Sequence, residues 1–113
     1  MVVQQELTDD EVDRIFHALA DTTRRDIVRR TLTGTASVSE LARSYTMSFA
    51  AVQKHVAVLE GAGLVTKESR GRERIVRAEA ETIARAQALL DAYADLWRGR
   101  IDRLDALLTE DRS

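Results

Sequence analysis

The sequence has no cysteine and no proline, only five glycines, and few aromatic residues. Without cysteine, the chain cannot form a disulfide, bind a metal through thiolates or use a thiol nucleophile. With only two histidines, Asp and Glu would have to supply most ligands of any metal site. With no proline and little glycine, helices meet few breakers. The composition therefore favours a helical protein whose core is built from Leu, Val, Ile and Ala.

Two further kinds of segment are missing from the chain. No run approaches the roughly 18 apolar residues that a membrane-spanning helix needs. The N-terminal stretch MVVQQELTDDEV lacks the basic and apolar regions of a signal peptide. We therefore expect a cytoplasmic protein with no membrane partner. The 113 residues, of which 44% are hydrophobic and 32% charged, are expected to form one soluble domain.

Charge is distributed unevenly along the chain. Residues 22–77 carry eleven Lys and Arg against five acids, whereas the segments on either side are acidic, so the net charge is only −2. A basic middle between acidic flanks can bind a polyanion while the whole protein stays soluble. Ordinary solvated surface charge is the alternative interpretation.

The first third of the chain predicts two helices. One covers about residues 9–20, with Thr8 or Asp9 as its N-cap, and carries apolar residues at helical spacing. The next follows Asp21 or Thr22 as cap and is expected to end at Gly34 in the left-handed conformation. The apolar residues at helical spacing on the first helix are Val12, Ile15, Phe16 and Leu19, and those expected to face inward on the second are Ile27, Val28 and Leu32.

A helix-turn-helix is predicted over about residues 37–61. The stretch SVSELARSY reads as a short helix capped by Ser37 or Ser39, and Ser48 caps a second helix that runs to about Gly61. Two short helices joined by a tight turn, the second amphipathic, are typical of this motif.

Residues 64–79 then predict a β-hairpin. The stretches LVTKESR and ERIVRAE form two strands around a tip at Gly71, and a long helix over about 81–108 closes the chain. The predicted fold is mainly α with a small two-stranded hairpin. This is a winged helix-turn-helix, in which five helices flank the hairpin wing.

The helix that begins after Ser48 has two contrasting faces. Val52, Val56 and Leu59 lie on one side and predict a core stripe, while Gln53 and Lys54 lie among alanines on the other. Gln pairs with adenine edges, and Lys with guanine or phosphate. The hydroxyl and free N–H groups at Ser48 suit a phosphate. The competing interpretation is a surface helix whose polar residues only face water.

The hairpin tip is rich in arginine. Arg70, Arg72 and Arg74 alternate along it, so they either share one face or splay from the tip. Such a tip beside a recognition helix suits backbone phosphates or the minor groove. A solvated hairpin end is the alternative.

Three stretches together resemble the ArsR-type winged-helix repressors: ALADTTRRDIVRRTL, SVSELARSYTMSFAAVQKHVAVLEGAGLV and SRGRERIVR. The resemblance covers about residues 15–77, with Thr22 where the family usually has proline. It implies DNA contacts by Phe49, Ala50, Gln53 and Lys54. For the neighbouring His55, a phosphate contact and a structural role both remain open. It also implies that helices 9–20 and 81–108 pack across a two-fold axis.

The last predicted helix carries a broad apolar stripe that a small domain cannot easily cover by itself. We therefore expect it to form a dimer interface, although the helix could instead fold back on its own core. The residues expected at this interface are Leu90, Tyr93, Trp97, Ile101, Leu104 and Leu108.

No metal site or cofactor is expected. Where metal-sensing relatives carry thiolates in the third helix, this chain has Ser37 and Ser39, and its last helix has no histidine. The remaining histidine, His17, is expected to pack or hydrogen-bond at a helix surface. No catalytic pattern suggests an enzyme.

The sequence thus predicts a homodimeric, metal-independent regulator that binds double-stranded DNA at a palindromic operator, with repression implied by the family. The alternative is a winged-helix interaction module whose basic tip binds an acidic partner. Neither the operator nor a small-molecule ligand can be identified from the residues.

Overall fold

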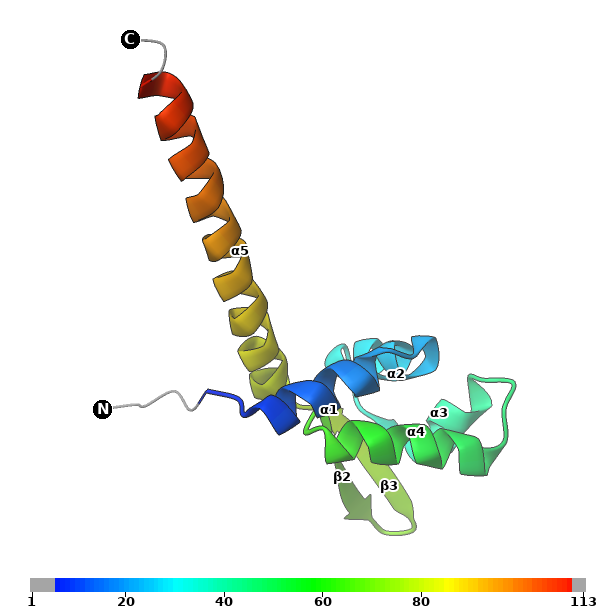
Figure 1. The fold of residues 1–113 in the computed structure, drawn as a ribbon. Coiled ribbons are helices and arrows are strands. Elements are labelled where there is room, and N and C mark those ends of the chain that lie inside the picture. Colours follow the sequence, from blue (N-terminus) through cyan, green and yellow to red (C-terminus); the bar gives the residue numbers. More distant parts are fainter. Residues whose placement is uncertain (1–5, 111–113) are drawn as a thin grey trace.

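The structure is a computed structural model, and it describes residues 6–110. Residues 1–5, on which part of the signal-peptide prediction rests, lie outside the described residues. The elements, shown in Figure 1, are α1 (Asp9–Leu19), α2 (Thr22–Leu32), β1 (Ala36–Ser37), α3 (Val38–Arg43), α4 (Phe49–Gly61), β2 (Val65–Arg70), β3 (Glu73–Ala78) and α5 (Ala80–Glu110).

The first four helices begin at polar caps that the sequence placed to within one or two residues. In each, the cap oxygen accepts a hydrogen bond from the backbone N–H three residues later, at 3.0–3.1 Å. In α1 and α3 a glutamate three residues after the cap bonds back to the cap N–H, completing a capping box. The caps are Thr8, Asp21, Ser37 and Ser48.

The core lies where α1 to α4 meet the sheet. The predicted stripe of α4 is confirmed, because Val52, Val56 and Leu59 are completely buried. A Schellman motif ends α4: Leu64 N–H bonds to the Leu59 carbonyl and Gly63 N–H to that of Glu60, both at 3.0 Å. Gly63 has φ +74°, which glycine adopts without strain. The motif turns the chain directly from α4 into the sheet.

The sheet has three antiparallel strands in the order β1-β3-β2, so the predicted two-stranded hairpin was incomplete. The additional strand pairs Ala36 with Val76 and Ser37 with Ile75. Two residues cannot show a strand periodicity, and their partners lie some forty positions away, so no local pattern marks β1. Ser37, the residue that caps α3, is therefore also bonded to strand β3 of the wing.

Two predictions at the end of α2 are wrong. Leu32 is half exposed, and Thr31 is the buried residue instead. The Thr31 hydroxyl donates back to the carbonyls of Ile27 (2.8 Å) and Val28 (3.1 Å), which removes the cost of burying it. The helix ends through Thr33 in a right-handed conformation, and Gly34 does not adopt a positive φ.

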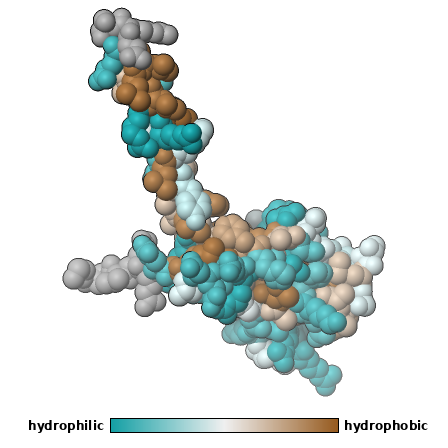
Figure 2. All heavy atoms as spheres, viewed as in Figure 1, coloured by the Kyte–Doolittle hydropathy of each residue, from teal (hydrophilic) through white to brown (hydrophobic). Residues whose placement is uncertain are grey.

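The long helix α5 projects away from the rest of the molecule (Figure 1). The radius of gyration is 19.6 Å, against about 13 Å for a compact chain of this length. Ala86 is the only buried residue that α5 contributes to the described chain. The helix therefore does not fold back on its own core. Hydrophobic residues recur along it between hydrophilic ones in Figure 2.

Candidate nucleic-acid interface

One side of α4 is open to solvent, and we call it the reading face. Gln53 and Lys54 are exposed there, and their side chains make no hydrogen bond or ion pair with other described residues. Phe49 is 47% exposed, which is unusual for a large aromatic side chain. The reading face consists of Phe49, Ala50, Gln53, Lys54 and Ala57.

The N-terminus of α4 leaves donors available beside this face. The Ser48 hydroxyl is occupied as the cap, accepting from Ala51 N–H at 3.1 Å. The N–H groups of Phe49 and Ala50 bond to no acceptor among the described residues. Free N–H groups at a helix start favour an anion such as a phosphate.

The wing, formed by β2, β3 and their loop, has a tip of two residues, Gly71 and Arg72. Gly71 has φ +61° at the first central position, as a type II′ turn requires. Across the ladder, Arg70 pairs with Glu73 and Ser69 with Arg74. Because neighbouring pairs point to opposite faces, Arg70 and Arg74 lie on opposite faces, with Arg72 in the loop. Of the two arrangements left open by the sequence, the arginines therefore splay.

The reading face and the wing border a common depression of about 260 Å³. Phe49 and Gln53 line it from α4, and Arg72 and Arg74 line it from the wing. Two predicted groups of residues that are far apart in the sequence are thus brought to one surface.

The lysines and arginines divide into engaged and free groups. Those of α1 and α2 bond to backbone carbonyls or to Asp26, and four of the others, Lys67, Arg77, Arg85 and Arg98, are paired with nearby acids. Arg100 lies over the Trp97 ring instead. The cations without a hydrogen bond, ion pair or ring contact in the described chain are Arg43, Lys54, Arg70, Arg72, Arg74 and Arg103. Five of these six belong to α3, α4 and the wing, so the free positive charge is concentrated there.

Arg43 was not identified by the sequence reasoning. Glu40, three residues earlier, is a natural ion-pair partner on a helix. In the structure, Glu40 is engaged by the N–H of Ser37, 3.3 Å from its Oε1, and Arg43 remains free. Arg43 is free because Glu40, its natural partner, is occupied in the cap of α3, and the sequence alone does not show this.

His55 does not join the reading face. Its Nδ1 lies 3.2 Å from the Arg24 guanidinium and 3.8 Å from Asp21 Oδ2. Arg24 also donates to the carbonyls of Ala18 (2.7 Å) and His17 (3.1 Å), at the end of α1. A bond from Arg24 N–H holds the pKa of Asp21 below its usual range. Of the two roles open for His55, the structure favours the structural one, which joins α4 to α1 and α2.

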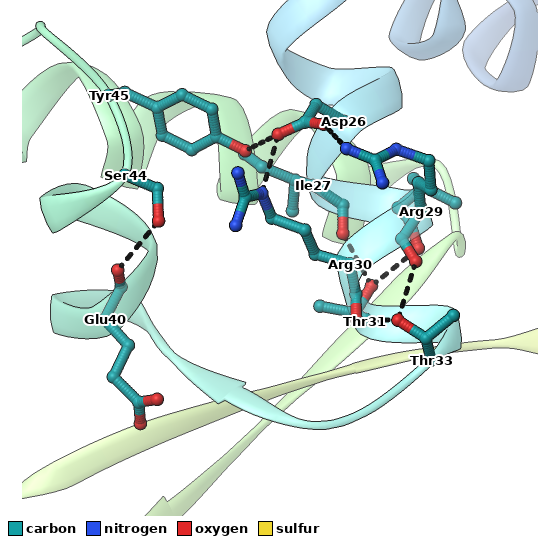
Figure 3. A network of polar contacts seen from close by, with 10 residues as sticks. Asp26, Ile27, Arg29, Arg30, Thr31, Thr33, Glu40, Ser44 and Tyr45 are labelled. Carbon is teal, nitrogen blue, oxygen red and sulfur yellow. Dashed lines mark hydrogen bonds and ion pairs between the residues drawn. The ribbon is translucent and has the colours of Figure 1, made fainter.

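A second polar cluster fixes the turn of the helix-turn-helix (Figure 3). The Tyr45 hydroxyl donates to Asp26 Oδ2 at 2.5 Å, Arg30 Nε bonds to the same oxygen at 2.7 Å, and Arg29 pairs with the other oxygen. The Arg30 guanidinium lies over the Tyr45 ring, 5.6 Å from its centre. These bonds, with that of Tyr45 the largest, hold the pKa of Asp26 far below normal. Burial and the Asp26 carboxylate raise the pKa of Tyr45 to about 12.

Two other kinds of site have no counterpart in the part of the chain that the structure describes. Nowhere between residues 6 and 110 do three or more His, Cys, Asp or Glu side chains converge as ligands for a metal ion. No helix within that range is both long enough and apolar enough to cross a membrane.

Comparison with known proteins agrees with this geometry. The model of the family described as "Bacterial regulatory protein, arsR family" matches residues 21–67. The HTH-type transcriptional regulator Rv2034 of Mycobacterium tuberculosis is 40% identical over 81 residues, covering 72% of this chain and 76% of that protein.

Solved structures share the fold. The crystal structure of an ArsR family transcriptional regulator superposes with a TM-score of 0.77 at 34% identity, covering 83% of this chain and 97% of that one. The homodimeric winged helix-turn-helix DNA-binding domain Mb0332 of Mycobacterium bovis has a TM-score of 0.63 at 28% identity, covering 84% and 91%. This chain therefore belongs to the ArsR family of bacterial regulatory proteins, and it is a winged helix-turn-helix DNA-binding transcriptional regulator, not an enzyme.

Proposed function

We propose that the protein is a homodimeric repressor that binds a palindromic operator through the reading face of α4 and the wing. One observation carries the proposal: the free cations concentrate on α3, α4 and the wing, and two of them share a depression with Phe49 and Gln53. An uncompensated group of cations suits a polyanion whose counterions are released on binding.

The proposed contacts divide by chemistry. Ser48 and the free N–H groups beside it, together with Lys54, would hold phosphates at the groove edge. Gln53, Phe49 and Ala50 would face the base edges, since residues near the start of a recognition helix enter the major groove. The splayed Arg70, Arg72 and Arg74 would bind backbone phosphates on the flanking DNA.

The proposed dimer rests on the apolar stripe of α5, in which Tyr93, Trp97 and Leu104 are each at least half exposed. The stripe is symmetric about Trp97: Leu90 and Leu104 lie seven residues to either side, and Tyr93 and Ile101 lie four residues to either side. In a two-fold antiparallel pair centred on Trp97, residue i meets residue j while j meets i. The symmetric spacing would then place apolar residues of one copy opposite apolar residues of the other.

Charge supports the same register. In an antiparallel pair centred on Trp97, Asp91 would meet Arg103 of the other copy. Arg103 is the one free cation outside α3, α4 and the wing, and Asp91 likewise has no partner among the described residues. The related Mb0332 domain is itself homodimeric. On α1, the exposed Phe16 would extend the covered surface.

A two-fold dimer presents two recognition helices, which would read half-sites about one DNA turn apart. Occupying such an operator would block polymerase and repress transcription. The chain has no thiolate, and neither of its two histidines lies on α5. Micromolar zinc, cadmium or arsenite should therefore leave the affinity for DNA unchanged, and a stoichiometric metal that shifts it tenfold would contradict metal independence.

Selection of bound sequences from a random duplex pool tests DNA recognition. We expect an inverted repeat whose affinity falls steeply with salt and exceeds that for random duplex by about 10³-fold or more. Equal affinity for selected and random duplexes would contradict the proposal and favour the interaction module that binds an acidic partner.

Single cysteines test the dimer cleanly, since the chain has none of its own. Under mild oxidation, a mixture of Leu90→Cys and Leu104→Cys should give a cross-linked heterodimer, while each variant alone should give little. Cross-linking of Leu90→Cys with itself would instead indicate a parallel pair and contradict the antiparallel register. No cross-link in any mixture would place the interface elsewhere.

A further inference from the structure

The middle of the reading face carries no charge. At 100° per residue, Phe49, Gln53, Ala57 and Ala50 span an arc of about 100°, and Lys54 lies about 40° beyond its edge. All five residues are exposed, whereas the core stripe, which borders the arc next to Phe49 with Val56 and Val52, is fully buried. The residues placed to meet base edges are therefore an amide, an aromatic ring and two methyl groups.

Each of these groups matches a particular edge in the major groove. An amide can pair with N6 and N7 of adenine, which offer one donor and one acceptor. Apolar carbons contact the C5 methyl of thymine, which no other DNA base carries there. A guanine edge offers two acceptors and is read best by Arg or Lys, and neither occurs in the middle of this face.

The surroundings allow the groups to act in this way. The Gln53 side chain has no partner in the described chain, so both ends of its amide are available. Phe49 and Gln53 line the depression from α4, and the wing lines it with Arg72 and Arg74 together with Lys67 and Glu73. The cations thus stand beside the reading face, where phosphates would lie, and leave its middle to the bases. Ala50 is exposed and carries only a methyl group, so the helix backbone could approach a groove closely there.

From this arrangement we infer that α4 reads adenine–thymine base pairs, with Gln53 hydrogen-bonding an adenine and Phe49 and Ala50 contacting thymine methyl groups. The inference rests on the proposed binding of DNA, and it names the bases that the site selects. Lys54, at the edge, contributes affinity without selecting a base.

Base analogues test the inference on the full-length protein and the duplex recovered from the random pool. Uracil in place of thymine removes only the C5 methyl, and 7-deazaadenine in place of adenine removes only the N7 acceptor. We expect uracil at one or two positions of each half-site to weaken binding about fourfold, the value of one buried methyl group. We expect 7-deazaadenine at one position to weaken it about fivefold or more.

Variants assign each effect to a side chain. Gln53→Ala should bind the 7-deazaadenine and adenine duplexes equally, and Phe49→Ala should lose the penalty for uracil at one position. Lys54→Ala is the control on the same helix: it should weaken every duplex by a similar factor and leave both analogue penalties unchanged. All three side chains are exposed, so the variants should fold as the parent does.

The outcomes separate this inference from the proposed function. If the protein binds its selected duplex tightly but tolerates uracil and 7-deazaadenine at every position, then the inference is overturned and DNA recognition stands. A selected half-site in which guanine contacts depend on Lys54 would also overturn it. If no duplex is bound selectively, both the proposed function and the inference fail.

Discussion

The body of the molecule (residues 9–78) and the helix α5 place their apolar side chains in opposite ways. In the body, Val52, Val56 and Leu59 are completely buried, and the cations without a partner gather on α3, α4 and the wing. On α5 two ion pairs run along the helix, Glu81–Arg85 and Asp95–Arg98, whereas Trp97 and Leu104 are at least half exposed. The body is therefore complete as a fold and open towards a polyanion, while α5 is open towards an apolar partner.

This difference indicates that the proposed dimerisation and DNA binding would use separate surfaces. The groups that would contact DNA lie on α4 and the wing, and those that would contact a second copy lie along α5 (Figure 1). Mutations on α5 should then weaken the dimer, and mutations on α4 or the wing should weaken DNA binding without affecting the dimer. The substitutions below are ordered from the largest expected effect to the smallest.

The largest effect is expected for Trp97→Ala, at the centre of the α5 stripe. Truncation of a buried Trp costs about 3–5 kcal/mol, and here the cost should fall on the dimer. Sedimentation should show dissociation, melting should become more dependent on concentration, and operator binding should be lost although no DNA contact is altered. A variant that remains dimeric and binds its operator normally would place the interface elsewhere.

In the body, Leu59→Ala should be nearly as costly, but with a different signature. It opens a cavity beneath α4 and should lower the free energy of unfolding by about 2–5 kcal/mol. Because Leu59 is remote from the α5 stripe, the dimer dissociation constant under native conditions should not change. Urea unfolding and sedimentation measure the two quantities, and Leu59→Met, with an expected cost below about 1.5 kcal/mol, is the matched control. Weaker dimerisation in Leu59→Ala would show that the two regions are not independent.

A smaller effect is expected for Tyr45→Phe, in the turn before α4. It removes one hydrogen bond to the Asp26 carboxylate and should destabilise the body by about 1–2 kcal/mol at neutral pH. Urea unfolding measures this loss. An unchanged free energy of unfolding would mean that the two arginines alone hold Asp26.

Alkaline pH gives the same substitution a second readout. The folded-state pKa of Tyr45 is raised from 10.0 to about 12, so its bond stabilises the fold fully below pH 10 and less as the pH rises through 12. The parent should therefore lose more stability over this range than Tyr45→Phe does. Parallel curves for the two proteins would contradict this role of the hydroxyl.

The smallest effect on stability is expected for Arg72→Ala, at the tip of the wing. An exposed side chain without a partner should change the free energy of unfolding by less than about 0.5 kcal/mol. It should nevertheless weaken binding to all duplexes about equally and lower the salt slope by about one unit. Arg85→Ala, which removes a cation paired with Glu81 on α5, should leave the slope unchanged. If Arg72→Ala also leaves it unchanged, Arg72 does not contact phosphate.

Much of the fold could be predicted because the signals were local. The spacing of Val52, Val56 and Leu59 predicted which side of α4 is buried, and polar caps such as Ser48 located the helix starts. The strand β1 could not be predicted, since its existence depends on pairing with β3. Leu32 was placed inward on hydrophobicity, but helix geometry puts Thr31 beside Ile27 and Val28, and a hydroxyl bonded to the preceding turn can be buried there.

The sequence predicted which surfaces form the candidate site, but not which individual side chains are free to act there. The sequence indicated the reading face and the arginine tip, and the geometry brings both to one depression. The sequence could not distinguish Arg43, which is free, from Arg24, which is engaged at the end of α1. It also left the role of His55 open, because the contact with Arg24 joins residues 31 positions apart.

The single tryptophan gives the protein an optical reporter of the proposed dimer. Indole emission moves to shorter wavelengths when the ring leaves water, and Trp97 is 58% exposed on α5, whereas the body contains no tryptophan. Covering α5 should shift the emission, while events confined to the body or the wing should leave it largely unaffected. Titrating the unlabelled protein by dilution would therefore yield the dimer dissociation constant, and adding DNA to the same cuvette would reveal whether operator binding strengthens that association.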